Sequence, residues 1–181
     1  MADEVLRMEH ITKIYSNGFI ANQDVTFGVG KNEIHALVGE NGAGKTTLMK
    51  VLFGMEPSQE GKIFINGQEE KLQNPLHAIS KGVGMVHQHF MLLPSLTVAE
   101  NVTLGVEPTK GALYDFDRAV KETQEIADKY NFDIDARARV RDLSVGQMQK
   151  VEILKALIKG VKILIMDEPT AVLTPQETQE L

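Results

Sequence analysis

The chain has 181 residues, of which 43% are hydrophobic and 24% charged, so it is long and apolar enough to bury a core. Its 19 Lys and Arg residues against 25 Asp and Glu residues give a net charge of −6, which disfavours a protein that coats duplex DNA, because neutralising phosphates requires clustered cations. The absence of cysteine excludes a disulfide framework and a Cys-ligated metal centre. No apolar run approaches the length of a membrane span, so we expect any membrane contact to go through a partner.

Strand patterns dominate the first part of the chain. Residues 6–15 are predicted to form a strand that ends at an Asn-Gly turn, and residues 25–29 alternate between apolar and polar or small side chains, as in a half-buried strand. The mostly apolar run 34–38 is predicted to be a short strand covered on both faces. An Asn-Gly pair within 61–68 predicts a hairpin with a type I′ turn, because both positions accept a positive φ.

Two short helices are predicted on either side of this hairpin. One follows a Gly-rich loop and runs over about 45–53, with Gly54 at its end. The other begins at Asn74-Pro75, an N-cap followed by proline at the first helical position, and ends at Gly82. The apolar run 83–86 is then predicted to be a further short strand.

The helical period dominates residues 88–160. One predicted helix can be capped by Asp115 or Asp117, whose carboxylates suit the free N–H groups of a first turn. Its inner face is predicted to consist of seven side chains at helical spacing: Phe116, Ala119, Val120, Thr123, Ile126, Ala127 and Tyr130.

A second helix of this region begins at Ser144, and Gln147 three residues later completes a capping box. Met148, Val151, Leu154 and Ile158 give this helix an apolar stripe, and Lys155 and Lys159 are interpreted as its solvated face. The short apolar run 163–166 that follows is predicted to be another strand, so the helices interrupt an α/β core.

A phosphate-binding loop is predicted between the 34–38 run and the first helix. The residues Gly39-Glu40-Asn41-Gly42-Ala43-Gly44-Lys45-Thr46 match the pattern G-x-x-x-x-G-K-[ST] in full. The glycines let the backbone wrap closely around phosphates, and the following helix adds the positive end of its dipole. Lys45 is predicted to place its charge near the β- and γ-phosphates, and the Thr46 hydroxyl to ligate Mg²⁺. The alternative, a Gly-rich turn before a helix, is disfavoured by this strand-to-helix context.

An acidic pair follows the last predicted strand. Asp167 and Glu168 come directly after the apolar run 163–166, and a buried strand that ends in Asp is what a Mg²⁺ site opposite a phosphate loop requires. Asp167 is predicted to act through the metal, and Glu168 to polarise an attacking water as a general base. Taken alone the pair could be an ordinary acidic turn, but with the phosphate loop it predicts a single site.

These motifs together resemble the nucleotide-binding domain of an ABC transporter. Leu143-Ser144-Val145-Gly146-Gln147 resembles the L-S-G-G-Q signature of that family, with Val145 in place of the first glycine. The resemblance implies that Ser144, Val145, Gly146 and Gln147 contact ATP bound by a second nucleotide-binding domain.

Three further residues take roles from the same resemblance. Gln88 matches the family's Q-loop and would contact Mg²⁺ or the attacking water. Tyr15 matches the aromatic residue that stacks on adenine, and Thr47 completes the ATP-binding segment. The implied fold is an α/β P-loop NTPase, RecA-like core formed by residues 1–87 and 161–181, with a helical subdomain over 88–160 that carries the signature.

The resemblance also implies the function and the partners. Residues 85–90 and 168–174 resemble the importers for sugars and nucleosides, in which one long polypeptide often carries two such domains. The implied activity is hydrolysis of Mg-ATP between paired domains to drive solute transport, at the cytoplasmic face of the cell membrane. The implied partners are a second nucleotide-binding domain, the membrane-embedded permease subunits and, indirectly, a solute-binding protein, with no nucleic acid.

Two departures from the family pattern limit this expectation. Thr174 stands where the family commonly has Asp, and the family's switch His would lie beyond Leu181, so the sequence resembles a truncated first domain that hydrolyses almost no ATP by itself. Two other functions remain open: an ABC-type ATPase that acts on nucleic acid or ribosomes, and a module that senses ATP without hydrolysing it. The acidic charge and the short 88–144 segment disfavour the first, and Glu168 disfavours the second.

Overall fold

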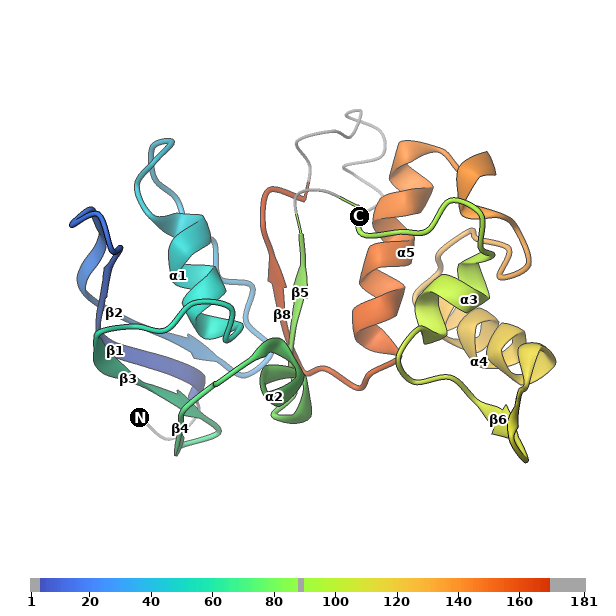
Figure 1. Ribbon diagram of the computed structural model, residues 1–181, viewed down its shortest axis with the longest axis horizontal. Helices are drawn as coiled ribbons and strands as arrows, with labels where there is room; N and C mark the ends of the chain where they lie inside the picture. The colour runs from blue at the N-terminus through green and yellow to red at the C-terminus, as the bar shows by residue number, and fades with distance from the viewer. Residues whose placement is uncertain (1–3, 88–89, 170–181) are drawn as a thin grey trace. The chain divides into compact units, whose positions relative to one another are not determined.

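The computed structural model describes residues 4–87 and 90–169 (Figure 1). Two compact units make up the chain, Met1–Gly84 and Met85–Leu181. Within the described ranges, no helix is long and apolar enough to cross a membrane.

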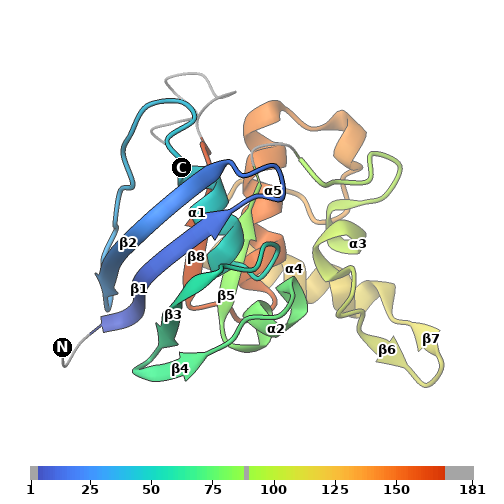
Figure 2. The same ribbon diagram turned by 60° about the vertical axis from the view of Figure 1, so that its left-hand side comes forward.

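An antiparallel sheet forms the base of the first unit. Its strands are β1 (Glu4–Ile14), β2 (Ile20–Gly30), β3 (Glu60–Ile65) and β4 (Gln68–Glu70), in the spatial order β2-β1-β3-β4 (Figure 2). Alternate side chains of β1 and β3 point into the core, as expected when one face of a sheet is covered. Helix α1 (Lys45–Leu52) covers this face with three buried side chains: Leu48, Val51 and Leu52.

Local turn signals of the sequence are confirmed in this unit. The turn between β3 and β4 places Asn66 at φ 50° and Gly67 at φ 77°, as a type I′ hairpin requires. Helix α2 (Pro75–Ser80) begins where the Asn74 side chain accepts a hydrogen bond of 2.9 Å from the backbone N–H of His77. Gly82, which follows this helix, has a φ of 84°.

The predicted strand over 34–38 is not formed. This segment has no regular secondary structure, and its apolar side chains are exposed, Ile34 completely and Val38 to 89%. A strand needs a neighbour for its backbone N–H and C=O groups, and no strand of the described residues pairs with this segment. The segment is held by local contacts instead, because His35 stacks on Phe27 of β2 and its Nδ1 contacts the Glu33 carboxylate at 3.1 Å. The contact with His35 and a hydrogen bond from the Gly30 N–H both lower the pKa of Glu33.

The second unit combines a small sheet with a group of helices. Strand β5 (Val83–Val86), whose first residues belong to the first unit, pairs with β8 (Ile163–Met166). The helices are α3 (Val98–Thr103), α4 (Phe116–Lys129), a 3₁₀ turn η1 (Val140–Asp142) and α5 (Val145–Leu157). A two-stranded hairpin, β6 (Thr109–Lys110) with β7 (Leu113–Tyr114), projects between α3 and α4 (Figure 1).

The core of these helices lies where α3, α4 and α5 meet. Its buried members are Val98, Val102, Ala127, Ile134, Val140, Val151 and Leu154. The Asp115 carboxylate caps α4 by accepting from the Arg118 N–H at 3.1 Å, whereas Asp117 pairs with Arg137 at 2.9 Å. The predicted inner face of α4 is therefore confirmed at Ala119, Thr123 and Ala127, and Tyr130 lies beyond the end of the helix.

Helix α5 is enclosed more fully than a single apolar stripe predicts. Beside Val151 and Leu154, the polar side chains of Gln149, Lys150 and Glu152 are also buried. Lys155, interpreted from the sequence as solvated, is only 18% exposed and donates hydrogen bonds to Met91 O at 2.8 Å and Glu152 Oε2 at 3.1 Å. The interpretation was wrong because Glu152 and the backbone at Met91 provide acceptors that helical periodicity does not reveal.

Candidate functional site

The phosphate loop turns sharply into helix α1. Gly42 and Gly44 have φ values of 83° and 86°, in the left-handed region that favours glycine. At Gly44 a Cβ atom would lie 2.1 Å from the carbonyl oxygen of Ala21, so a side chain is excluded by contact as well as by conformation. Strand β2 thus presses directly against the last glycine of the loop and fixes the start of α1.

Lys45 lies over the loop that precedes it. Its Nζ donates to the carbonyl oxygens of Gly39 at 2.8 Å and Glu40 at 2.9 Å. The side chain is partly exposed, and the first turn of α1 contains no acidic residue. An ammonium group beside the N-terminus of a helix is an arrangement that attracts a multiply charged anion.

Tyr15 lies beside the first turns of the same helix. Its hydroxyl is 3.4 Å from Oγ1 of Thr47. On the other side the buried Lys13 places its Nζ 5.1 Å from the centre of the Tyr15 ring, held there by Glu56 at 3.0 Å and by the carbonyl oxygen of Pro57 at 2.8 Å. The structure therefore brings Tyr15, Thr47 and the phosphate loop together within one unit.

Asn22 is a residue of this site that the sequence analysis missed. Its side-chain amide donates to the carbonyl oxygen of Gly44 at 3.2 Å, so it braces the phosphate loop from β2. The residue is buried, and within the described part of the chain its Oδ1 has no hydrogen-bond partner. No local pattern marks an Asn in the middle of a strand as a brace for a loop more than twenty residues away.

Asp167 and Glu168 follow β8 as predicted, in the second unit. The backbone N–H of Asp167 extends the pairing of the strands by donating to Val86 O at 3.2 Å. Glu168 has a φ of 49°, a left-handed conformation that costs a non-glycine residue about 1–2 kcal/mol. Such strain is common at functional sites, which motivates the catalytic role predicted for Glu168 without testing it. Among residues 4–87 and 90–169, no three His, Cys, Asp or Glu side chains gather closely enough to hold a metal ion by themselves.

The signature segment begins helix α5. Ser144 Oγ accepts from the Gln147 N–H at 3.2 Å, and Gln147 Oε1 accepts from the Ser144 N–H at 3.0 Å, so the predicted capping box is confirmed. Ser144 and Val145 are exposed, whereas Gly146 is buried. The helix therefore begins at two accessible residues, Ser144 and Val145.

Two predicted positions lie outside the described residues, namely Gln88 and Thr174. Their roles stay predictions. So do the assignment of residues 1–87 and 161–181 to one domain and the relation of Asp167 and Glu168 to the phosphate loop.

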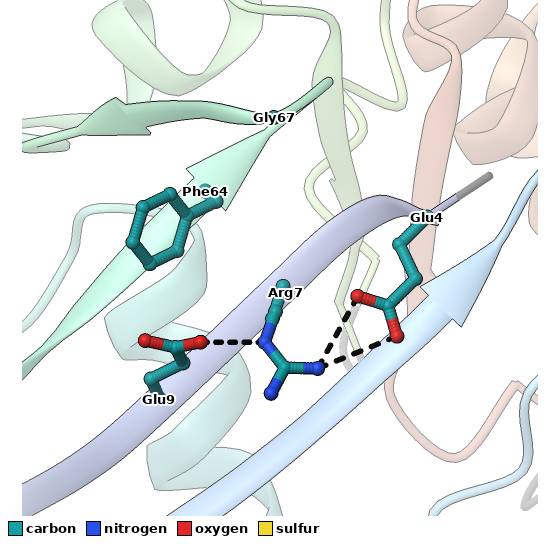
Figure 3. A pocket seen from close by; sticks show the side chains of 5 residues that line it. All are labelled: Glu4, Arg7, Glu9, Phe64 and Gly67. Carbon is teal, nitrogen blue, oxygen red and sulfur yellow. Dashed lines mark hydrogen bonds and ion pairs between the residues drawn. The ribbon is translucent and has the colours of Figure 1, made fainter. Parts of the chain in front are cut away.

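A separate pocket lies on β1 and the β3–β4 hairpin and contains none of the predicted site residues. It is lined by Glu4, Arg7, Glu9, Phe64 and Gly67 (Figure 3). The Arg7 guanidinium bonds to Glu9 at 2.6 Å and to Glu4 at 3.3 Å, and these partners raise the pKa of Arg7 further. Because its cation is already neutralised by two carboxylates, this pocket is not a candidate phosphate site.

The loop and the α/β fold define a phosphate-loop nucleotide-binding protein. The model of the family described as ABC transporter matches residues 22–171, and the chain belongs to this family.

Several curated relatives are similar to the chain over nearly its whole length. It is 50% identical to the nucleoside import ATP-binding protein NupA of Lactococcus lactis, covering 100% of this chain and 36% of the relative. It is 50% identical to the guanosine import ATP-binding protein NupO of Bacillus subtilis, over 98% of this chain and 34% of the relative. It is 46% identical to the xylose import ATP-binding protein XylG of Geobacillus kaustophilus, covering 100% and 36%. The chain thus spans about a third of the length of these relatives.

Solved structures of ATP-binding cassettes are similar as well. One cassette of an ABC transporter in its ADP conformation matches with a TM-score of 0.85 at 27% identity, over 98% of this chain and 73% of that chain. A nucleotide-free cassette matches with a TM-score of 0.85 at 26% identity, over 98% of this chain and 74% of that chain. The predicted fold class, an α/β P-loop NTPase, is confirmed.

Proposed function

We propose that the chain is part of the ATP-binding subunit of an ABC importer for a sugar or a nucleoside, and that it binds Mg-ATP at the phosphate loop. The observation that carries the proposal is the geometry of that loop: two left-handed glycines deliver a G-x-x-x-x-G-K-T segment to the start of α1 with Lys45 lying over it. The names of the relatives, which cover nucleoside, guanosine and xylose import, support the solute class.

Each residue of the site then has a distinct task. The backbone of residues 39–47 and the Lys45 ammonium bind the phosphates, and the Tyr15 ring stacks on the base. Thr46, Gln88 and Asp167 would supply oxygen ligands, directly or through water, for Mg²⁺, which would contribute positive charge to the phosphate site. Glu168 polarises the attacking water as the general base.

The signature helix works on a partner. The start of α5, where Ser144 and Val145 are exposed, carries the positive end of the helix dipole, which suits the γ-phosphate of ATP held by a second nucleotide-binding domain. Closure of the two domains around ATP and reopening after hydrolysis would be passed to permease subunits in the membrane, and indirectly to a solute-binding protein. The subunit would then work at the cytoplasmic face of the membrane.

Titration calorimetry with Mg-ATP tests this proposal through Lys45→Ala. A charge-assisted contact with the phosphates contributes about 1.5–3 kcal/mol, so the affinity should fall roughly ten- to a hundredfold. Lys50→Ala is the matched control, because Lys50 lies in the last turn of the same helix, away from the loop. Equal affinities of the wild type and Lys45→Ala would refute the assignment of the loop, and salt-sensitive binding of RNA or DNA that depends on nucleotide would favour an ATPase acting on nucleic acid.

A further inference from the structure

We propose that Asn22 is a positioning residue of the phosphate site, which holds the peptide unit between Gly44 and Lys45 so that the Lys45 N–H points into the phosphate loop. This inference rests on the proposed function, because it names a residue that acts on the bound phosphates through that loop. Since Asn22 is only 6% exposed, it acts from beneath the loop and does not touch the nucleotide.

Strand β2 encloses Gly44 with two consecutive residues. The Asn22 Nδ2 donates to Gly44 O at 3.2 Å. A Cβ atom added at Gly44 would lie 2.7 Å from that Nδ2 and 2.1 Å from the carbonyl oxygen of Ala21. Gly44 directly precedes α1, and no side chain of the described residues caps this helix. The start of α1 is therefore fixed by its contacts with β2.

Fixing the Gly44 carbonyl group also fixes the N–H group that follows it. The carbonyl oxygen accepts two hydrogen bonds, one from Asn22 and one of 2.9 Å from the Leu48 N–H within α1. The peptide unit is planar, and its C=O and N–H groups point in opposite directions. The Lys45 N–H therefore points to the N-terminal end of α1, where residues 39–44 form the phosphate loop. A phosphate in the loop can accept this N–H only while the peptide unit keeps its orientation.

The side chain of Asn22 carries a cost that packing does not explain. Within the described residues, its Oδ1 is buried without a hydrogen-bond partner. Lys13, which pairs with Asn22 across β1 and β2, binds the Glu56 carboxylate and the Pro57 carbonyl oxygen instead. A buried acceptor without a donor lowers the free energy of unfolding, and an apolar side chain of similar shape would avoid this loss. Such a group calls for a functional explanation, and the hydrogen bond to Gly44 provides one.

The effects of Asn22 on stability and on binding are therefore expected to have opposite signs. Leucine has the same branched shape as asparagine, but its side chain neither donates nor accepts a hydrogen bond. In Asn22→Leu the Gly44 carbonyl keeps its bond from Leu48 and the unpaired oxygen is removed, so the urea midpoint of unfolding should rise, or at least not fall. The affinity for Mg-ATP should nevertheless fall about three- to tenfold, which corresponds to the loss of one hydrogen bond.

Titration calorimetry and urea unfolding of the full chain test this inference together. The ligands are ATP and inorganic tripolyphosphate, each with Mg²⁺, and Asn22→Leu should lose affinity for both by the same factor, because the effect is on the phosphates. Asn22→Ala also lacks the donor but has a smaller volume, so it should lose as much affinity as Asn22→Leu. Gln23→Leu is the matched control, since Gln23 is the exposed amide side chain next along β2, and it should bind both ligands as the wild type does.

The outcomes separate this inference from the proposed function. If the wild type binds ATP and both Asn22 variants bind it equally well, Asn22 does not position the loop. The inference also fails if affinity and urea midpoint fall together in both variants, because Asn22 then has a structural role only. A loss in one variant alone would assign the effect to packing, and a loss for ATP without tripolyphosphate would assign it to the base or the sugar; either result overturns the inference. If the wild type binds neither ligand, the phosphate loop assignment fails first.

Discussion

The buried carboxylate of Glu152 is expected to hold the segment at Met91 against helix α5. Glu152 is 5% exposed, and its Oε1 accepts from the Met91 N–H at 2.5 Å while its Oε2 accepts from Lys155 Nζ. Glu152→Ala removes both hydrogen bonds and leaves the Met91 N–H without its acceptor. Hydrogen bonds to charged groups contribute about 1.5–3 kcal/mol each, but Lys155 keeps its bond to Met91 O and can reach water. We therefore expect the free energy of unfolding to fall by about 2–4 kcal/mol.

Urea unfolding followed by circular dichroism measures this loss. Glu122→Ala is the matched control, because Glu122 also pairs with a cation on its own helix, Arg118 at 2.7 Å, but in an exposed i, i+4 pair whose loss costs only about 0.3–0.5 kcal/mol. Glu152→Gln keeps one acceptor oxygen for the Met91 N–H, so its loss of unfolding free energy should lie between those of Glu122→Ala and Glu152→Ala. A change below about 0.5 kcal/mol for Glu152→Ala would show that the carboxylate is not needed to hold this segment.

Three more outcomes are expected. Gly44→Ala should abolish nucleotide binding measured by calorimetry, because its Cβ would meet Ala21 O at 2.1 Å and its φ of 86° disfavours any side chain; binding at wild-type affinity would contradict the loop geometry. Tyr15→Ala should weaken ATP and GTP alike by about 1–3 kcal/mol, and selective loss of ATP in a competition assay would mean that Tyr15 reads the base edge. Hydrogen bonds from the backbone N–H of Thr97 and then from its hydroxyl lower the pKa of Glu100 below the usual 4.5. The ionised Glu100 therefore stabilises α3 at pH values above 4.5, and this stabilisation is lost as the pH falls through the lowered pKa. Acid titration of the unfolding free energy should show this slope and Glu100→Gln should lack it, whereas an equal slope in both would exclude Glu100 as its source.

Local signals in the sequence determined most of the elements correctly. The Asn66-Gly67 turn, the Asn74 cap before Pro75 and the Ser144 capping box all form as predicted. Each depends on residues within about four positions of one another, so the chain carries its own partners for these hydrogen bonds. The phosphate loop is also a locally determined feature, because its motif places glycine at positions 42 and 44, where the backbone has a positive φ.

Only the tertiary structure decided features whose partners lie far along the chain. The 34–38 run has the composition of a strand, but a strand exists only if another strand pairs with it. The sequence allowed either Asp115 or Asp117 as the cap of α4. In the structure Asp115 caps the helix, while Asp117 forms an ion pair with Arg137, 20 positions away.

The same reason explains the long-range contacts that sequence reasoning missed. Asn22 braces Gly44 from β2, and Lys155 bonds to Met91, 64 positions away. Sequence patterns report which residues share a face of one element, whereas these contacts depend on which elements the fold brings together.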